Sequence, residues 1–371
     1  MLVLGAGFGG LELATVLSRE LGDSLDLTLI DSAESFTFGF AKLDVLFGKA
    51  ASEAVRIRRE LSKPGVRLLR ETVTAVDPQA RRVTTDQGVH EADHLVLALG
   101  AEYDLDATPG LGQTGYEFYS LEGAERLREV LPSFSGGHAV IGVCGAPYKC
   151  PPAPSEAALL LDEYLTARGV RDDCRITYVV PTPVPVTSSA EASQALLARF
   201  AERGIEFVPG RRVASIDGAS RVAVLDDGSE LPCDLFLGVP KHRGPRVLEP
   251  VGFAEDGFVA VDKATLQTRF PGVYAIGDSV SMPLPKAGAI AEGQARAVAA
   301  SLLAALRGDP EPPPYRGSGS CYIEFGGGQV ARVDVDFSGP APTGTFNGPS
   351  TALAEDKHEF GSSRRARWFG G

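Results

Sequence analysis

The sequence predicts an α/β protein with two parallel-sheet domains and a smaller α+β domain at its C-terminal end. Three observations carry this prediction: a glycine-rich turn between a strand and a helix within residues 1–21, a strand–helix–strand pattern within 138–180, and a proline-rich break at 310–314 followed by a hairpin pattern. Strands that alternate with helices favour parallel sheets. The predicted boundaries are 1–112 with 245–309 for the first domain, 113–244 for the second and 310–371 for the third.

The composition is that of an ordinary globular enzyme. Hydrophobic residues make up 44% of the 371 residues and charged residues 23%, as in typical soluble domains. A net charge of -12 argues against nucleic acid as a partner, because phosphate binding needs basic surface. We find no apolar run of about 18 residues and no signal peptide, so a cytoplasmic location is expected. The five cysteines are therefore expected to be free, catalytic or metal-binding.

The first domain begins with a dinucleotide-binding pattern. The strand-like run Met1–Leu4 leads into Gly5-Ala6-Gly7-Phe8-Gly9-Gly10 and the amphipathic segment Leu11–Leu21. Such glycines permit a tight turn, and the helix start offers free N–H groups to a pyrophosphate. A second strand, Asp26–Ile30, ends in Asp31, which can accept hydrogen bonds from a ribose about 20 residues after the loop. The alternative is a plain glycine-rich turn with a solvated aspartate.

A second motif lies far along the chain. Residues 268–278 predict a turn, a buried strand and Gly277-Asp278 at its end, before an Ala-rich helix over Ala289–Leu306. With the first loop, this T…PGVYAIGD string resembles the two-dinucleotide-domain flavoprotein superfamily. The resemblance implies FAD as the cofactor, with Asp278 bonded to its ribitol or pyrophosphate.

The same resemblance assigns three further cofactor residues. Ala287, near the helix start, is expected at the flavin pyrimidine, where a helix N-terminus stabilises the anionic reduced ring. Lys286 is expected beside it, with a solvated surface lysine as the alternative. Gly100, after the strand-like run 93–99, matches the point where the chain leaves the FAD domain.

The second domain is predicted to keep a Rossmann-like fold and to have lost its nucleotide site. After the strand His138–Val143, the glycine spacing is lost. Four prolines follow, up to Pro154, and they hold the helix Ser155–Arg168 away from the strand. After the next strand, Arg175–Val180, Pro181 stands where a ribose-binding acid is expected. Because pyrophosphate binding needs a helix start directly after the turn, we expect no NAD binding here.

The replaced loop carries a cysteine motif, Tyr148-Lys149-Cys150-Pro151-Pro152-Ala153-Pro154-Ser155-Glu156. It resembles the segment around the first redox cysteine of flavocytochrome c sulfide dehydrogenases and sulfide:quinone oxidoreductases, and the resemblance covers nearly the whole chain. It implies a second redox cysteine at Cys321 and a proton-transfer role for Glu156. The alternatives are a Cys144–Cys150 pair, a structural role for Cys321 as a small buried residue, and a helix-dipole role for Glu156.

The resemblance therefore implies an FAD domain interrupted by a degenerate NAD-type domain, and oxidation of sulfide or a sulfane-sulfur compound. Hydrosulfide would open a Cys150–Cys321 disulfide to give a persulfide and a thiolate, and two electrons would pass through the flavin to a quinone or an electron-transfer protein. No histidine comes soon after the 175–180 strand, where some quinone-reducing relatives carry one, and this weakens the case for a quinone. A type II NADH:quinone oxidoreductase and a non-catalytic FAD-binding sensor stay open as alternatives.

The C-terminal domain is predicted to contain a hairpin, Ser320–Phe325 and Gln329–Phe337, that turns at 326–328. Its last residues, 363–369, mix cations with aromatic residues. This mixture predicts packing on the FAD domain or on a homodimer partner, or a peripheral contact with an anionic membrane.

Overall fold

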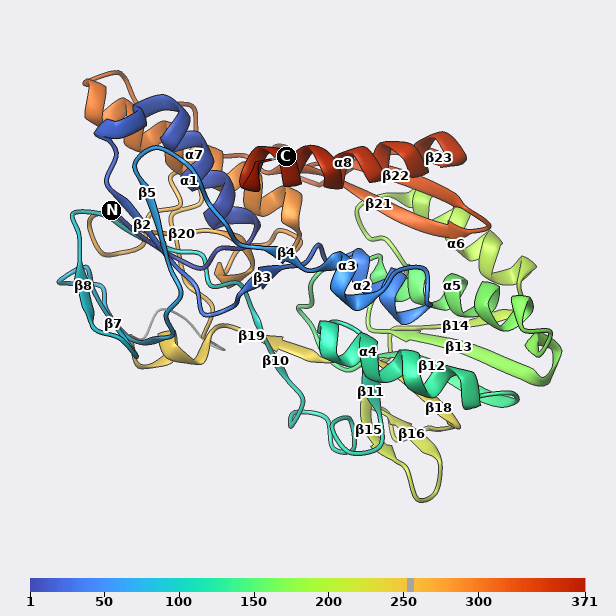
Figure 1. The fold of residues 1–371 in the computed structure, drawn as a ribbon. Coiled ribbons are helices and arrows are strands. Elements are labelled where there is room, and N and C mark those ends of the chain that lie inside the picture. Colours follow the sequence, from blue (N-terminus) through green and yellow to red (C-terminus); the bar gives the residue numbers. More distant parts are fainter. Residues whose placement is uncertain (252–256, 371) are drawn as a thin grey trace.

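The computed structural model describes residues 1–251 and 257–370. Two five-stranded parallel sheets lie next to each other, and a C-terminal antiparallel sheet with a long helix lies along one side of both (Figure 1). This arrangement confirms the predicted fold class of two Rossmann-like units and a smaller α+β unit. The exact domain boundaries stay a prediction.

The first sheet combines the start of the chain with a strand near residue 273. Its order is β20 (Val273–Ala275), β9 (Leu95–Leu97), β1 (Leu2–Leu4), β2 (Leu27–Ile30) and β5 (Val66–Leu69). Helices α1 (Phe8–Leu21) and α7 (Gly288–Arg307) pack against each other beside it. Side chains alternate across β1, so that Val3 faces the α1/α7 core and Leu2 and Leu4 face a second apolar cluster.

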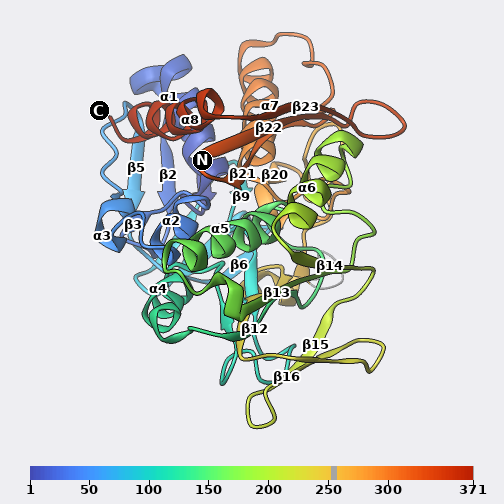
Figure 2. The same cartoon turned by 90° about the vertical axis from the view of Figure 1, so that its right-hand side faces the viewer.

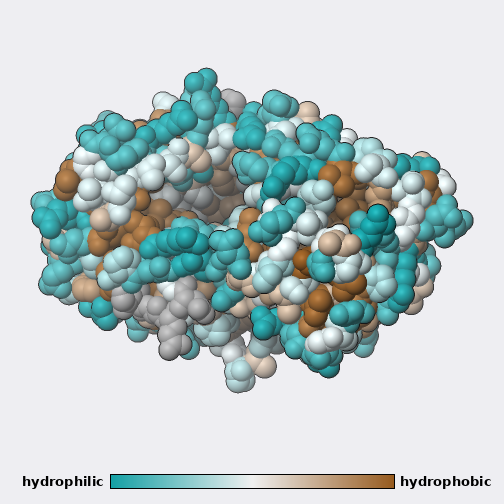
Figure 3. All heavy atoms as spheres, turned by 90° about the horizontal axis from the view of Figure 1, so that it is seen from below, coloured by the Kyte–Doolittle hydropathy of each residue, from teal (hydrophilic) through white to brown (hydrophobic). Residues whose placement is uncertain are grey.

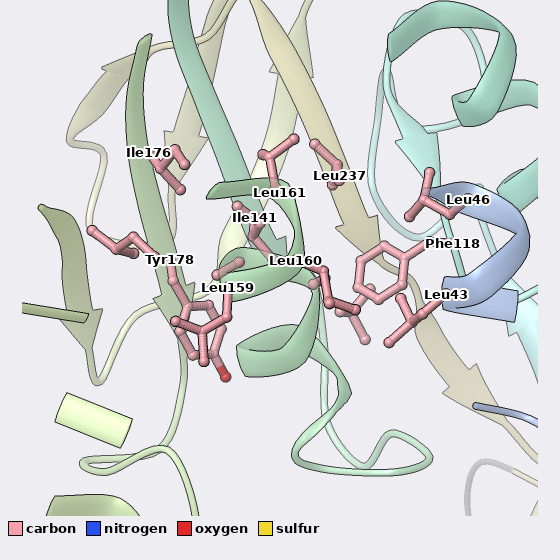
Figure 4. Close-up of a cluster of buried hydrophobic side chains, with 14 of the residues drawn as sticks. Leu43, Leu46, Phe118, Ile141, Leu159, Leu160, Leu161, Ile176, Tyr178 and Leu237 are labelled. Carbon is pink, nitrogen blue, oxygen red and sulfur yellow. The ribbon is translucent and has the colours of Figure 1, made fainter. Parts of the chain in front are cut away.

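The second sheet has the order β11 (Tyr116–Glu117), β18 (Leu235–Val239), β12 (Gly137–Val143), β13 (Cys174–Val180) and β14 (Ile205–Pro209). Helices α4 (Leu121–Val130), α5 (Ala153–Ala167) and α6 (Ala190–Glu202) accompany it. The two predicted strands and the α5 helix are confirmed. Figure 4 shows its core, in which Leu43 and Leu46 of α2 (Ala41–Leu46) lie beside Phe118 and the α5 leucines. A segment of the first domain's sequence therefore helps to build the core of the second domain.

Smaller elements complete the two larger units. They are α3 (Ser52–Val55), the pair β3 (Ser35–Phe36) and β4 (Ile57–Arg58), the pair β10 (Glu102–Asp104) and β19 (Lys241–Arg243), and two three-stranded sheets, β6 (Val73–Asp77) with β7 (Arg82–Thr85) and β8 (Val89–Glu91), and β15 (Val213–Asp217) with β16 (Val222–Leu225) and β17 (Glu230–Pro232). Seen from the side drawn in Figure 3, the surface is mostly hydrophilic and its apolar residues lie in separate groups.

The C-terminal unit contains β21 (Ser318–Gly326), β22 (Gln329–Asp336) and β23 (Thr343–Ser350), followed by α8 (Thr351–Phe369). The predicted hairpin is confirmed, and its turn uses left-handed backbone at Gly326, Gly327 and Gly328. Strand β23 and helix α8 were not predicted. In both ribbon views α8 runs past the sheet to reach α1 (Figures 1 and 2).

Among the described residues, α7 is the one helix that is long and apolar enough to cross a membrane by those criteria alone. Half of its most apolar stretch is buried inside the protein. It packs on α1 and on β21, as the core helix of a globular protein does.

Candidate active site

A cavity of about 540 Å³ opens where the carboxyl ends of β1, β2, β9 and β20 face the second domain. Every residue predicted to bind the cofactor lines it except Gly10, and so do two of the three predicted catalytic residues: Gly5, Gly7, Phe8, Gly9, Asp31, Gly100, Gly277, Asp278, Lys286, Ala287, Cys150 and Glu156. Motifs from the start, the middle and the end of the chain therefore meet at one place.

The first glycine loop has the geometry of a phosphate-binding turn. Only residues 5–7 separate β1 from α1, and Gly5 has a φ of 102°. A Cβ atom on Gly10 would lie 1.9 Å from the Gly5 carbonyl oxygen, so Gly10 is needed to close the turn rather than to line the cavity. A Cβ atom on Gly7 would meet no protein atom within 4 Å. Because no side chain caps α1, its first N–H groups are available to a ligand.

Asp31 ends β2 and faces the cavity. Its Oδ2 accepts a hydrogen bond from the Ala6 N–H (2.6 Å) and its Oδ1 accepts one from the Ala33 N–H (2.8 Å). The Arg59 guanidinium donates to the same Oδ1 at 2.5 Å. The carboxylate still has acceptor capacity for a ribose hydroxyl. Sequence analysis missed Arg59, which also lines the cavity.

Lys286 is only 8% exposed, so the alternative of a solvated surface lysine is wrong. Its Nζ donates to the carbonyl oxygens of Asp278 (2.6 Å) and Val280 (3.2 Å), and lies 3.8 Å from the centre of the Phe258 ring. Burial lowers the pKa of Lys286 to about 8. Burial raises the pKa of Asp278 and nearby lysines oppose that shift.

Two further lysines at the cavity were missed by sequence analysis. Lys42 donates to the Tyr119 carbonyl oxygen (2.5 Å), and Lys149 donates to the Ala101 carbonyl oxygen (3.4 Å). Together with Lys286 they surround Asp278 and interact with its charge. Carbonyl oxygens accept hydrogen bonds from all three ammonium groups, so that three lysines interact with the one carboxylate of Asp278. An anionic group fits this charge.

The start of α7 also faces the cavity. Ala287 precedes the helix without a side-chain cap, which leaves free N–H groups as at α1. The side-chain oxygen of Gln294 accepts a hydrogen bond from the Gly277 N–H (2.6 Å) and so fixes the Gly277-Asp278 turn on α7. The Lys286 carbonyl accepts one from the Cys150 N–H (2.8 Å). The loop that carries Cys150 is therefore joined directly to the cofactor segment.

Three predicted catalytic residues form one cluster. Cys150 lines the cavity, and its backbone is left-handed, with a φ of 47°. Residues other than glycine seldom adopt this conformation, and those that do cluster at functional sites. Burial raises its pKa, and the charges of Glu156 and Cys321 raise it further. Burial, then Glu156, raises the pKa of Cys321 to about 11. Both cysteines are free thiols. Cys144 instead packs in a separate apolar cluster.

Glu156 lies within a buried charge network that sequence analysis missed. It is 2% exposed, and its Oε1 accepts a hydrogen bond from the Glu324 N–H (3.0 Å). The Glu324 carboxylate is paired with Lys357 of α8. Burial raises the pKa of Glu156 to about 7, against the opposing charge of Lys357, and Asp44 of α2 adds to the rise. Elements of all three units therefore set the protonation of Glu156.

The second loop is built differently from the first. Residues 144–152 separate β12 from α5. A Cβ atom on Gly142 would lie 2.6 Å from the Val213 side chain, and one on Gly145 would lie 2.9 Å from that of Lys241. Side chains therefore lie close against Gly142, at the end of β12, and against Gly145, in the loop. The expected loss of NAD binding stays a prediction.

The C-terminal residues pack on the first unit, as one of the sequence alternatives predicted. Arg364 pairs with Glu292 of α7 (2.5 Å) and Arg367 with Glu12 of α1 (2.7 Å). Trp368 is fully buried. These contacts use most of the cations and aromatic groups on which the membrane prediction rested. Membrane contact and a homodimer stay predictions.

Comparison with known proteins agrees with this geometry. A family model described as pyridine nucleotide-disulphide oxidoreductase matches residues 1–297. The mitochondrial sulfide:quinone oxidoreductase of Mus musculus is 26% identical over 369 residues, covering 93% of this chain and 80% of that protein. A type II NADH:quinone oxidoreductase of Staphylococcus haemolyticus is 25% identical, covering 83% of each chain.

A solved structure shares the whole fold. The X-ray structure of the sulfide:quinone oxidoreductase from Aquifex aeolicus matches with a TM-score of 0.89 at 23% identity, over 100% of this chain and 92% of that one. The chain therefore belongs to the pyridine nucleotide-disulphide oxidoreductase family, and it is a flavin oxidoreductase that is similar to sulfide:quinone oxidoreductases.

Proposed function

We propose that this protein is an FAD-dependent oxidoreductase that oxidises sulfide or a sulfane-sulfur compound through Cys150 and Cys321. The observation that carries the proposal is that Cys150 lines the cofactor cavity and interacts electrostatically with both Cys321 and Glu156. Relatives named for sulfide oxidation support the choice of substrate.

The cavity residues fit FAD. Two uncapped helix starts and the open Gly7 face suit a pyrophosphate, and the unpaired ammonium groups of Lys42, Lys149 and Lys286 suit its negative charge. FAD, when bound, supplies a two-electron acceptor beside Cys150. A quinone, as in the names of the relatives, is the proposed final acceptor.

The proposed reaction starts from a Cys150–Cys321 disulfide, which would form from the free thiols seen here when their two electrons pass to bound FAD. Hydrosulfide attacks one sulfur, so that a new S–S bond forms in a persulfide, the Cys150–Cys321 bond breaks, and the other cysteine leaves as a thiolate with the electron pair. Oxidation of this thiolate–persulfide pair to a trisulfide then releases two electrons and the S–H proton. Each atom and charge is accounted for.

Glu156 is suited to accept that proton. It interacts with both cysteines, and a pKa of about 7 lets it take up and release a proton near neutral pH. Because burial raises the pKa of both thiols, their thiolates need such a neighbouring acceptor.

Anaerobic stopped-flow spectroscopy tests the proposal. Sulfide should bleach the visible flavin band of the parent protein, and Cys150→Ser and Cys321→Ser should slow bleaching by about 10³-fold while FAD stays bound. Cys144→Ser is the matched control and should bleach at the parent rate. If Cys321→Ser reacts as fast as the parent, the proposed pair is wrong; if Cys144→Ser is slow instead, the rival pair is correct.

A further inference from the structure

The last turn of α8 supplies partners to two buried carboxylates of the first unit. Glu12 on α1 and Glu292 on α7 are each 1% exposed. Arg364 donates to both carboxylate oxygens of Glu292 (2.5 and 2.9 Å), and Arg367 lies 2.7 Å from Glu12. Arg296 of α7 also pairs with both carboxylates, at 2.7 Å from Glu12 and 3.1 Å from Glu292. The α8 arginines therefore complete a shared buried charge network that joins the end of α8 to the two helices that start at the cavity.

Trp368 links the last turn of α8 to two residues that line the cavity. It is fully buried, and its indole N–H donates to Glu12 at 2.9 Å. Its ring packs edge-on against Phe8 (5.3 Å between centres) and Phe36 (5.7 Å), both of which line the cavity. Phe8 begins α1 directly after Gly7, and a Cβ atom on Gly288 would lie 2.6 Å from its ring. Phe8 is thus held between Trp368 and the start of α7.

The last turn of α8 also contacts the segment that carries the partner of Asp31. Lys63 donates from Nζ to the Arg367 carbonyl oxygen at 2.8 Å. Four residues earlier, Arg59 donates to Asp31 at 2.5 Å. The end of α8 therefore contacts the segment that holds Asp31 as well as the residue that follows the glycine loop.

We propose that the last turn of α8, through Trp368, Arg364 and Arg367, positions the Gly5–Gly10 loop for cofactor binding, so that the end of the chain's last helix is part of the FAD site. Trp368 acts as a positioning residue, since Phe8 and not Trp368 lines the cavity. Coupling between two sites is reciprocal, so a bound cofactor must favour the docked turn by the same factor by which docking favours the cofactor. The inference rests on FAD being the cofactor and is independent of the sulfur chemistry.

Affinity measurements on the apoprotein provide the first test. Trp368→Ala should raise the Kd for FAD by about tenfold, and Trp368→Phe, which keeps a ring against Phe8, by less. Arg365→Ala is the matched control, because Arg365 lies exposed on the same turn, and its Kd should stay within about twofold of the parent. Circular dichroism checks that each variant is folded; if Trp368→Ala is not, Trp368→Phe and Arg367→Ala decide the outcome.

The parent protein allows a second test without mutation, because Trp368 is the chain's single tryptophan. ADP, which carries the pyrophosphate but no flavin to absorb the emission, should lower the acrylamide quenching of Trp368 in the apoprotein by about twofold or more. Equal quenching with and without saturating ADP, or an unchanged Kd for FAD in folded Trp368→Ala, would overturn the positioning role. A parent apoprotein that binds no FAD would overturn the cofactor assignment instead.

Discussion

The two strand-to-helix loops that reach the cavity start from the same fold and serve different chemistry. The loop after β1 has three residues, and it exposes backbone at Gly7 to the cavity. The loop after β12 has nine residues, and the Lys241 side chain lies close to its glycine, Gly145. Its far end places Cys150 at the cavity, together with Ala153, the first residue of α5.

Under the proposed function, this difference is a way for a nucleotide-binding fold to acquire a redox group. A tight glycine turn brings the helix dipole and free N–H groups to a phosphate. The longer loop separates the start of α5 from the end of β12, and it places the side chain of Cys150 at the cavity. Here that loop is also hydrogen bonded through the Cys150 N–H to the Lys286 carbonyl, so its cysteine is held against the first unit's cofactor segment.

The largest expected effect is the difference between NADH and sulfide in the rate at which each reduces the flavin. NADH should reduce the flavin about 10³-fold more slowly than sulfide does, because residues 144–152 offer no phosphate cradle. Parallel stopped-flow traces with equal concentrations of the two donors measure the ratio. Rapid bleaching by NADH would contradict this reading of the second loop and would favour the NADH:quinone oxidoreductase alternative.

A pair of glycine substitutions should produce opposite effects in the two loops. Gly7 has an extended backbone (φ -88°) and open space at its Cβ, so Gly7→Ala should leave the stability of the apoprotein unchanged. Its methyl group would occupy the surface that a pyrophosphate approaches, and the Kd for FAD should rise by about tenfold. Fluorescence titration and thermal unfolding of the apoprotein measure both quantities.

Gly145→Ala is the control for that substitution. Its methyl group would lie 2.9 Å from the Lys241 side chain, so the protein should lose about 1 kcal/mol of unfolding free energy with little change in FAD affinity. If both variants change the same quantity, the functional contrast between the loops is wrong.

Local patterns predicted most of the fold and the cofactor residues. A strand, three glycines and an acid about 20 residues later lie close in sequence, and the folded chain keeps them together at Gly5, Gly7 and Asp31. Helix α8 was missed because its buried residues are Lys357, Gly361 and Trp368, which form no apolar stripe. One signal could have marked its start: Ser350, whose hydroxyl accepts a hydrogen bond from the Leu353 N–H.

The partners that tune the site could not be predicted in the same way. Glu324 and Lys357 come from β21 and α8, and Asp44 comes from α2. Their relation to Glu156 exists only after tertiary folding, and charged residues at such positions look like solvated surface in a sequence. The catalytic prediction therefore contained Glu156 without the groups that set its pKa.

The last expected effect concerns Glu156, just beyond the second loop. Its pKa is about 7 in the folded chain, so it is protonated and unable to accept a proton at lower pH. Glu156→Gln cannot accept a proton at any pH. The ratio of parent to variant rates of flavin reduction by sulfide should therefore rise from near one at about pH 5.5 to about tenfold at about pH 8.5. Taking the ratio at each pH cancels the ionisation of sulfide itself.

The free energy of unfolding should also depend on pH through Glu156, and the direction of this dependence follows from its pKa. Burial raises the pKa of Glu156 from 4.5 to about 7, so between these values the folded chain holds a proton that the unfolded chain has released. Stability from this group is therefore present below about pH 4.5 and is lost as the pH rises through 7, by at most about 3 kcal/mol. Glu156→Gln should flatten that dependence in denaturant titrations. Glu163→Gln, on the same helix but half-exposed, should leave both the rate ratio and the stability profile unchanged. A rate ratio that stays flat across the pH range, with Glu156→Gln as stable as the parent at every pH, would remove Glu156 from proton transfer and leave Cys150 as the proposed reactive side chain of the second domain.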